Sequence, residues 1–131
     1  MTRRRVSSNS PLEPVIGFSR AVRIGDFVCV SGTAPIGDDG QSLCPGDMAG
    51  QTRACFKIVE QSLAQLGASL SDVIRTRIML TDAARWKEAA EVHGEFFSDI
   101  MPACTFVEVK GFINKEWLVE VEADAVMSSE R

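Results

Sequence analysis

Residues 117–126 constrain the fold more than any other part of the sequence, because apolar side chains there alternate with polar ones. The odd positions carry Trp117, Val119, Val121, Ala123 and Ala125, whereas the even positions carry Leu118, Glu120, Glu122 and Asp124. A period of two is typical of a β-strand with one buried face. Such a strand needs neighbouring strands and a layer over its apolar face, so the segment predicts a sheet covered by other elements.

Four further segments predict strands. Residues 21–24 and 27–31 flank Gly25 and Asp26, whose turn chemistry is that of a hairpin. Residues 73–80 alternate, which places Ile74 on the same face as Ile78 and Val73 on the other.

Residues 104–110 also alternate, and they directly precede the strand at 117–126 in the sequence. We expect the two strands to pair. Their alternation would then place Cys104 and Glu120 on one face, where the two side chains line one cleft.

Two segments change to a period of three to four and predict helices. The first has one apolar stripe, an N-cap at Asp47 and a C-terminal glycine at Gly67; the stripe is Met48, Thr52, Cys55, Val59, Leu63 and Leu66. The second is capped by Thr81 or Asp82, and its apolar face is Trp86, Ala89, Ala90, His93, Phe96 and Phe97. On that face His93 is interpreted as a core histidine rather than a ligand. Two such helices on one face of a sheet predict an α+β domain.

The length of 131 residues predicts one domain. We place it at residues 14–127, between a flexible N-terminal tail at 1–13 and a short C-terminal tail at 128–131. Arg3, Arg4 and Arg5 are interpreted as a solvated, frayed end. Residues 33–47 are rich in glycine and proline and predict a loop with a tight turn at 38–40.

Charge and cysteine usage narrow the class of partner. A net charge of −4 disfavours nucleic acid and anionic membranes as partners, and no apolar run approaches the roughly 20 residues of a membrane span. Four scattered cysteines and one histidine do not form a metal-binding pattern. We therefore expect reduced thiols, a cytoplasmic location, no metal, and a small molecule or another protein as partner.

The sheet face away from the helices has a mixed composition. We expect it to carry Arg75, Arg77, Glu108, Lys110, Glu120 and Glu122, interspersed with Met79, Phe106 and Leu118. Solvation accounts for the charges but not for the apolar side chains among them. The mixture favours a subunit interface that contains a polar pocket.

An ordered set of short motifs resembles the RidA/YjgF family of enamine/imine deaminases over residues 14–126. The motifs are Val30-Ser31-Gly32 with Thr-Ala-Pro after it, the helix with Gln51 that ends in Leu66-Gly67, IMLTD at 78–82, Phe96-Phe97, Pro102-Ala103, Val107-Glu108-Val109 and the VEVEA of 119–123. The resemblance implies a chorismate-mutase-like fold of the YjgF type. It also implies a homotrimer with small-molecule clefts between subunits, and no metal or organic cofactor.

The same resemblance suggests roles for individual residues. Glu120 matches the family glutamate that positions or activates water. Gly32 and Thr33 lie in the ligand-lining stretch, and Phe18 stands where a tyrosine is common. Cys104 occupies the position of an arginine that binds the substrate's carboxylate bidentately, which places the chain in an arginine-lacking branch. We interpret this cysteine as lining the pocket rather than as a nucleophile, because a nearby carboxylate opposes thiolate formation.

Three functions follow, in order of preference. The first is a trimer that binds a small metabolite and acts as a deaminase or related hydrolase on C–N bonds, with Glu120 handling water. The second is a non-catalytic ligand-binding or regulatory module that kept the trimer. The third is the endoribonuclease activity sometimes attached to the family, which the acidic charge balance disfavours.

Overall fold

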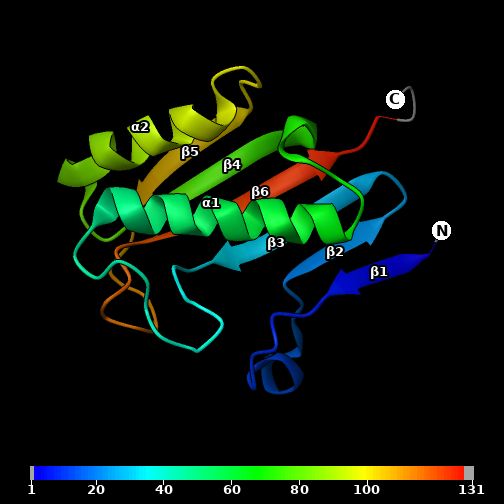
Figure 1. Cartoon of the computed structure of the whole chain (residues 1–131), viewed down its shortest axis with the longest axis horizontal. Coiled ribbons are helices and arrows are strands. Elements are labelled where there is room, and N and C mark those ends of the chain that lie inside the picture. Colours follow the sequence, from blue (N-terminus) through cyan, green and yellow to red (C-terminus); the bar gives the residue numbers. More distant parts are fainter. Residues whose placement is uncertain (1, 129–131) are drawn as a thin grey trace.

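The protein is described here by a computed structural model that covers residues 2–128, and it is built from one mixed sheet with helices on one face (Figure 1). The strands are β1 (Arg3–Val6), β2 (Ala21–Ile24), β3 (Phe27–Thr33), β4 (Val73–Leu80), β5 (Ala103–Glu108) and β6 (Val119–Val126). They lie in the order β1-β2-β3-β6-β4-β5, and only β4 and β5 are parallel. The α+β architecture expected from the sequence is confirmed.

The helices are α1 (Met48–Gln65) and α2 (Trp86–Phe97), with short turns η1 (Glu13–Gly17), η2 (Leu70–Asp72) and η3 (Ala83–Arg85). Helix α1 begins where the Asp47 carboxylate accepts a hydrogen bond from the Gly50 N–H at 2.9 Å. After the helix, Gly67 adopts a φ of 82°, which favours glycine. Both predicted helix ends are confirmed.

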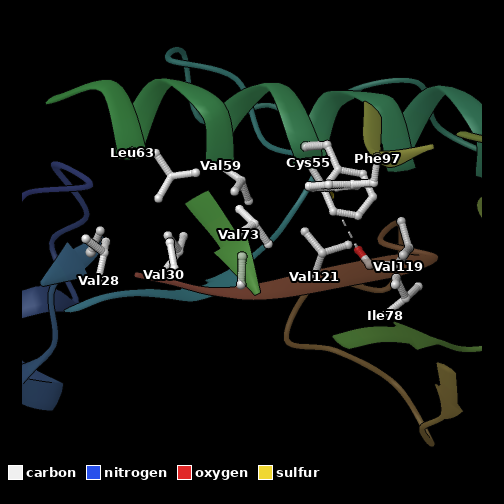
Figure 2. Packing of buried hydrophobic residues seen from close by; sticks show 14 of the residues in the cluster. Val28, Val30, Cys55, Val59, Leu63, Val73, Ile78, Phe97, Val119 and Val121 are labelled. Atoms are coloured by element: carbon white, nitrogen blue, oxygen red, sulfur yellow. Dashed lines mark hydrogen bonds between the residues drawn. The ribbon is translucent and has the colours of Figure 1, made fainter. Parts of the chain in front are cut away.

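The core lies between the helices and one face of the sheet (Figure 2). All six residues of the predicted α1 stripe are buried, and Figure 2 shows Cys55, Val59 and Leu63 pointing toward the strands. Facing them are Val30 and Val121. The opposite face of the sheet carries no helix in the described part of the chain and is called the open face below.

Helix α2 buries a slightly different face from the one predicted. Ala89, Val92 and Phe97 are buried, whereas Trp86 is 47% exposed. His93 is half-buried and its Nε2 lies 2.8 Å from the hydroxyl of Thr76. The interpretation of His93 as a core histidine is confirmed, and burial lowers its pKa.

The N-terminal segment is not the frayed end that we expected. Residues Arg3–Val6 form β1, which pairs antiparallel with β2 at the edge of the sheet. The Val6 side chain is buried in the core, and Arg4 donates from Nη2 to the carbonyl of Gln65. Charged side chains are compatible with an edge strand, because only one face of it needs to be apolar. Residues 129–131 of the expected C-terminal tail lie outside the described residues.

The expected pairing of the last two strands is wrong, because β4 lies between β5 and β6. Strand β4, helix α2 and strand β5 form a crossover unit that brings β5 beside β4 in parallel. Strand β6 then pairs with the other edge of β4. An irregularity between Val73 and Arg75 also reverses the predicted faces at the start of β4, so Val73 is buried and Ile74 is exposed.

Candidate active site around Glu120

The candidate site is centred on an irregularity in β3 that faces Glu120. Val30 pairs with Ala123 and Thr33 with Val121, so β3 uses one more residue than β6 over the same stretch. A β-carbon on Gly32 would lie 3.5 Å from Oε1 of Glu120. Gly32 therefore lies directly beside the Glu120 carboxylate of the neighbouring strand.

Glu120 points to the open face. Its neighbours Val119 and Val121 are buried in the core, and its partner across the ladder is Met79 of β4. The Glu120 side chain is half-buried and makes no hydrogen bond to any residue in the described part of the chain. A half-buried carboxylate with no hydrogen-bonding partner is typical of functional sites.

The electrostatic surroundings raise the pKa of Glu120 above its usual value. Burial is the largest cause, because it disfavours the charged form. The positive charge of Arg20 opposes this effect, and the negative charge of Glu122 adds to it. The carboxylate is consequently a better proton acceptor than an ordinary surface glutamate.

The other charges of the open face are arranged in cross-strand pairs. Arg77 of β4 binds Glu122 of β6 at 2.5 Å. Arg75 lies opposite Asp124. No ion pair joins Glu120 to Arg75 or Arg77 between residues 2 and 128.

Phe18 lies away from these charged pairs, at the end of η1. The side chain is half-buried and contributes to an open hollow of about 520 Å³ that Arg3, Arg5 and Glu13 also line. The backbone after Phe18 runs alongside the β3 irregularity, because the Ser31 hydroxyl donates to the Ser19 carbonyl at 2.6 Å. The backbone next to Phe18 therefore lies beside the β3 irregularity. The Phe18 side chain, however, lines a different hollow, one that neither Gly32 nor Glu120 lines.

Gly32 and Thr33 contribute to the site differently. Gly32 is exposed beside Glu120, whereas the Thr33 side chain is fully buried and its hydroxyl donates to the Ser31 carbonyl at 2.8 Å. Within the protomer, a ligand on the open face can contact the backbone at this position but not the threonine hydroxyl.

Cys104 is not on the same face as Glu120, which corrects the shared cleft expected within one chain. Cys104 pairs with Thr76, whose side chain is buried beneath α2. Two residues further along β5, Phe106 packs against Trp86 of α2, with ring centroids 6.4 Å apart. Cys104 is exposed on the helix side of an edge strand.

Arg20 is a site residue that the sequence reasoning missed. Its Nη2 atom donates to the carbonyls of Ser31 and Gly32, at 2.9 and 2.6 Å. Partners that are backbone carbonyls 11 and 12 residues away leave no pattern in the sequence. The only available signal was a lone arginine immediately before an apolar strand.

Neither a metal-binding group nor a membrane span is found between residues 2 and 128. No cluster of three or more His, Cys, Asp or Glu side chains there could hold a metal ion. No helix in this range is both long and apolar enough to cross a bilayer.

Comparison with known proteins places this geometry in a family. Residues 8–127 match the family described as Endoribonuclease L-PSP. The solved structure of Rv2704 from Mycobacterium tuberculosis, described as a member of the highly conserved YjgF/YER057c/UK114 family, is 47% identical. It covers 96% of this chain and 100% of its own, with a TM-score of 0.86, so the two folds agree.

Two other similar proteins have printed ligands or activities. The 3-aminoacrylate deaminase RutC of Acinetobacter baylyi is 32% identical over 112 residues, which are 86% of this chain and 88% of the relative. TdcF of Escherichia coli was solved with bound serine and is 26% identical, with a TM-score of 0.79. The match covers 95% of this chain and 94% of TdcF.

Proposed function

The chain belongs to the Endoribonuclease L-PSP family, which includes the RidA and YjgF proteins, and we propose that it hydrolytically deaminates a small imine or enamine in clefts between the subunits of a homotrimer. Glu120 is the residue that handles water in this proposal. The observation that carries it is a half-buried carboxylate that has no hydrogen-bonding partner between residues 2 and 128 and lies beside Gly32 of β3.

The reaction needs a base near an electrophilic carbon. The reacting species is the protonated imine, which an enamine reaches by taking a proton on its β-carbon. Water adds to the C=N carbon while the Glu120 carboxylate accepts one of its protons, which gives a neutral carbinolamine. The protonated carboxyl then returns that proton to the nitrogen, the C–N bond breaks as the hydroxyl oxygen forms the C=O bond, and the hydroxyl proton passes to solvent. Carbonyl product and ammonia leave, and no electrons are exchanged, so water is the only co-reactant. A raised pKa suits a group that must both accept and return a proton.

The opposite placement of Cys104 and Glu120 supports a cleft built from two protomers. One sheet cannot present both side chains to the same ligand, but a neighbouring copy can bring its own Cys104 edge to the open face of the first. The open face also exposes large apolar residues at one end, namely Ile24, Phe27, Ile74 and Val126. Apolar side chains gathered beside charges are characteristic of a subunit interface.

Cys104 in place of the family arginine favours an altered substrate, in the arginine-lacking branch that we propose for this chain. A second candidate is a ligand-binding module without turnover, which the same substitution supports. Endoribonuclease activity is the least favoured, because the net charge is −4. Among the described residues all four cysteines are free, in agreement with the reducing cytoplasm that we propose as the location.

Ammonia release from freshly generated imines and enamines tests the proposal. The natural chain should turn over at least one member of the panel, and Glu120→Gln should lower kcat at least about 100-fold, because general acid–base catalysis contributes this much. Glu122→Gln is the matched control, since it makes the same change on the same face of the same strand, and it should retain most activity. No turnover of any compound by the natural chain would leave the binding module as the better account.

A further inference from the structure

Arg3 and Arg5 of β1 lie on the open-face side of the sheet, because they are two residues apart on one strand. Arg4 between them lies on the helix side, where its Nη2 donates to the carbonyl of Gln65, the last residue of α1. Arg4 therefore helps to hold β1 against the helix. The packing of the sheet gives no such role to Arg3 or Arg5.

Neither of these two arginines has a countercharge opposite it in the sheet. The ladder partner of Arg3 is Ile24 and that of Arg5 is Val22, and both partners are apolar. No ion pair or side-chain hydrogen bond joins either guanidinium to a residue between 2 and 128. Two like charges roughly 7 Å apart along a strand repel each other, so an anion bound between them would be stabilising.

The two arginines line the hollow of about 520 Å³ beside η1. Phe18 and Pro14 supply apolar surface to the same hollow, which is lined further by Glu13, Gly17 and Ser19. Its volume is within the range of small-molecule sites. Two guanidinium groups next to an aromatic ring suit a ligand with an anionic head and an apolar body.

Glu13 is the one acidic side chain among the residues described around this hollow, and its carboxylate is already engaged. It accepts from the Ser7 hydroxyl at 3.0 Å and from both the N–H and the hydroxyl of Ser8. These bonds from Ser8 lower the pKa of Glu13, and the positive charge of Arg5 adds to the effect. Arg5 therefore influences Glu13 without a direct contact, and its donors stay available to a ligand.

We propose that this hollow binds the phosphate monoester group of a small soluble molecule with an apolar body, at a site separate from that of Glu120. One bidentate arginine occupies both oxygens of a carboxylate, whereas the three terminal oxygens of a phosphate monoester can accept from two arginines. The phosphate also carries close to two negative charges at neutral pH, which Arg3 and Arg5 balance. Phe18 contacts the apolar body.

Calorimetric titration with phenyl phosphate at about 0.15 M salt, where long-range charge effects are screened, tests the site. The natural chain should bind phenyl phosphate at least about tenfold more tightly than inorganic phosphate, which lacks the ring, or benzoate, which lacks the third oxygen. Arg3→Gln and Arg5→Gln should each weaken binding about tenfold or more. Arg4→Gln is the matched control, because it removes the same charge from the opposite face of the same strand, and it should change the affinity less than about twofold.

Two further variants separate the parts of the ligand. Phe18→Ala should weaken binding of phenyl phosphate and leave that of inorganic phosphate unchanged. Arg5→Lys should retain part of the affinity, because it keeps the charge without the fork. Unchanged binding in Arg3→Gln and Arg5→Gln, or an equal loss in Arg4→Gln, would overturn the proposal. A loss in Arg20→Gln instead would place the phosphate beside Glu120 and would overturn it as well.

A phosphate monoester also occurs on lipid headgroups, and Val15 and Ile16 on η1 are 80% and 62% exposed. Co-sedimentation with phosphatidylcholine vesicles that contain phosphatidic acid distinguishes this source from a soluble ligand. We expect the protein to stay in the supernatant, in keeping with its net charge of −4. Sedimentation with these vesicles, without binding of phenyl phosphate, would reject the soluble ligand. Failure of phenyl phosphate to bind at millimolar concentration would reject the site.

Discussion

Cys104 and Glu120 lie on opposite faces of one sheet, with β4 between their strands. Cys104 pairs with Thr76 of β4, whose side chain faces α2, whereas Glu120 pairs with Met79 of β4 and faces the open face. If both border the same ligand, they must come from different protomers. This requirement can be examined without a structure of the assembly.

If the chain forms the proposed homotrimer, mixed trimers should recover activity from two defective variants. Cys104→Trp would fill the proposed cleft from one side, and Glu120→Gln would remove the proposed base from the other. If each cleft combines two protomers, co-refolding equal amounts of both should leave about a quarter of the clefts intact. Ammonia release per chain is measured on the fraction whose mass is three times the 14.3 kDa of one chain. Clefts built from one protomer would show no recovery, and each variant alone provides the baseline.

The Gln51 side chain should be a strong contributor to stability. It is fully buried, donates from Nε2 to the Glu116 carbonyl at 2.9 Å and accepts from the Leu118 N–H at 2.8 Å. Gln51→Leu leaves both backbone groups without a partner, so we expect the free energy of unfolding to fall by about 2–4 kcal/mol. Denaturant unfolding at matched protein concentration measures this. Gln61→Leu, on the exposed side of the same helix, should change it little.

Local structure could be predicted from the sequence, because it depends on neighbours in the chain. The α1 stripe, the Asp47 cap, the φ of Gly67 and the hairpin at Gly25 each follow from residues within a few positions of each other. Strand β1 was not predicted because only its Val6 side chain is buried. The three arginines before Val6 show no alternation of apolar and polar residues.

The order of the strands was predicted wrongly at the point that mattered most for the site. Consecutive strands were expected to pair, although a helix between β4 and β5 is the signature of a parallel crossover. Applying that rule would have placed β5 beside β4. The irregularities at Gly32 and Ile74 have no such rule, because they arise from the fit between two strands that are distant in sequence. For the same reason Arg20 could not be found from its neighbours.

The pH dependence of activity should report the surroundings of Glu120. In the proposed reaction the active form of Glu120 is the carboxylate, and burial raises its pKa above the usual 4.5, so kcat/KM should fall at a higher pH than for an ordinary glutamate. The positive charge of Arg20 opposes this shift, hence Arg20→Gln should move the acidic inflection to higher pH. Glu122→Gln should move it to lower pH. Inflections that stay in place in both variants would mean that another group titrates.

His93 should make the protein less stable in mild acid. Burial lowers its folded-state pKa below the usual 6.5, so the unfolded chain binds more protons once the pH falls under that value. The free energy of unfolding therefore decreases between 6.5 and the lower folded-state pKa. His93→Gln keeps a polar partner for Thr76 but does not titrate, so the stability gap between it and the natural chain should narrow from about pH 7.5 to about pH 5. A stability gap that stays constant over this pH range would show that a group other than His93 causes the loss of stability in acid.

Cys104→Arg should supply a carboxylate-binding fork to the proposed cleft. Cys104 is exposed on an edge strand, so the longer side chain fits without disturbing the core. Relative to the natural chain, the variant should raise kcat/KM for an imino acid about tenfold or more over that for the imino amide of the same carbon skeleton, because a charged hydrogen bond contributes about 1.5–3 kcal/mol. Cys104→Lys supplies the charge without the fork and should give a smaller gain. An unchanged ratio in Cys104→Arg would mean that position 104 does not border the ligand.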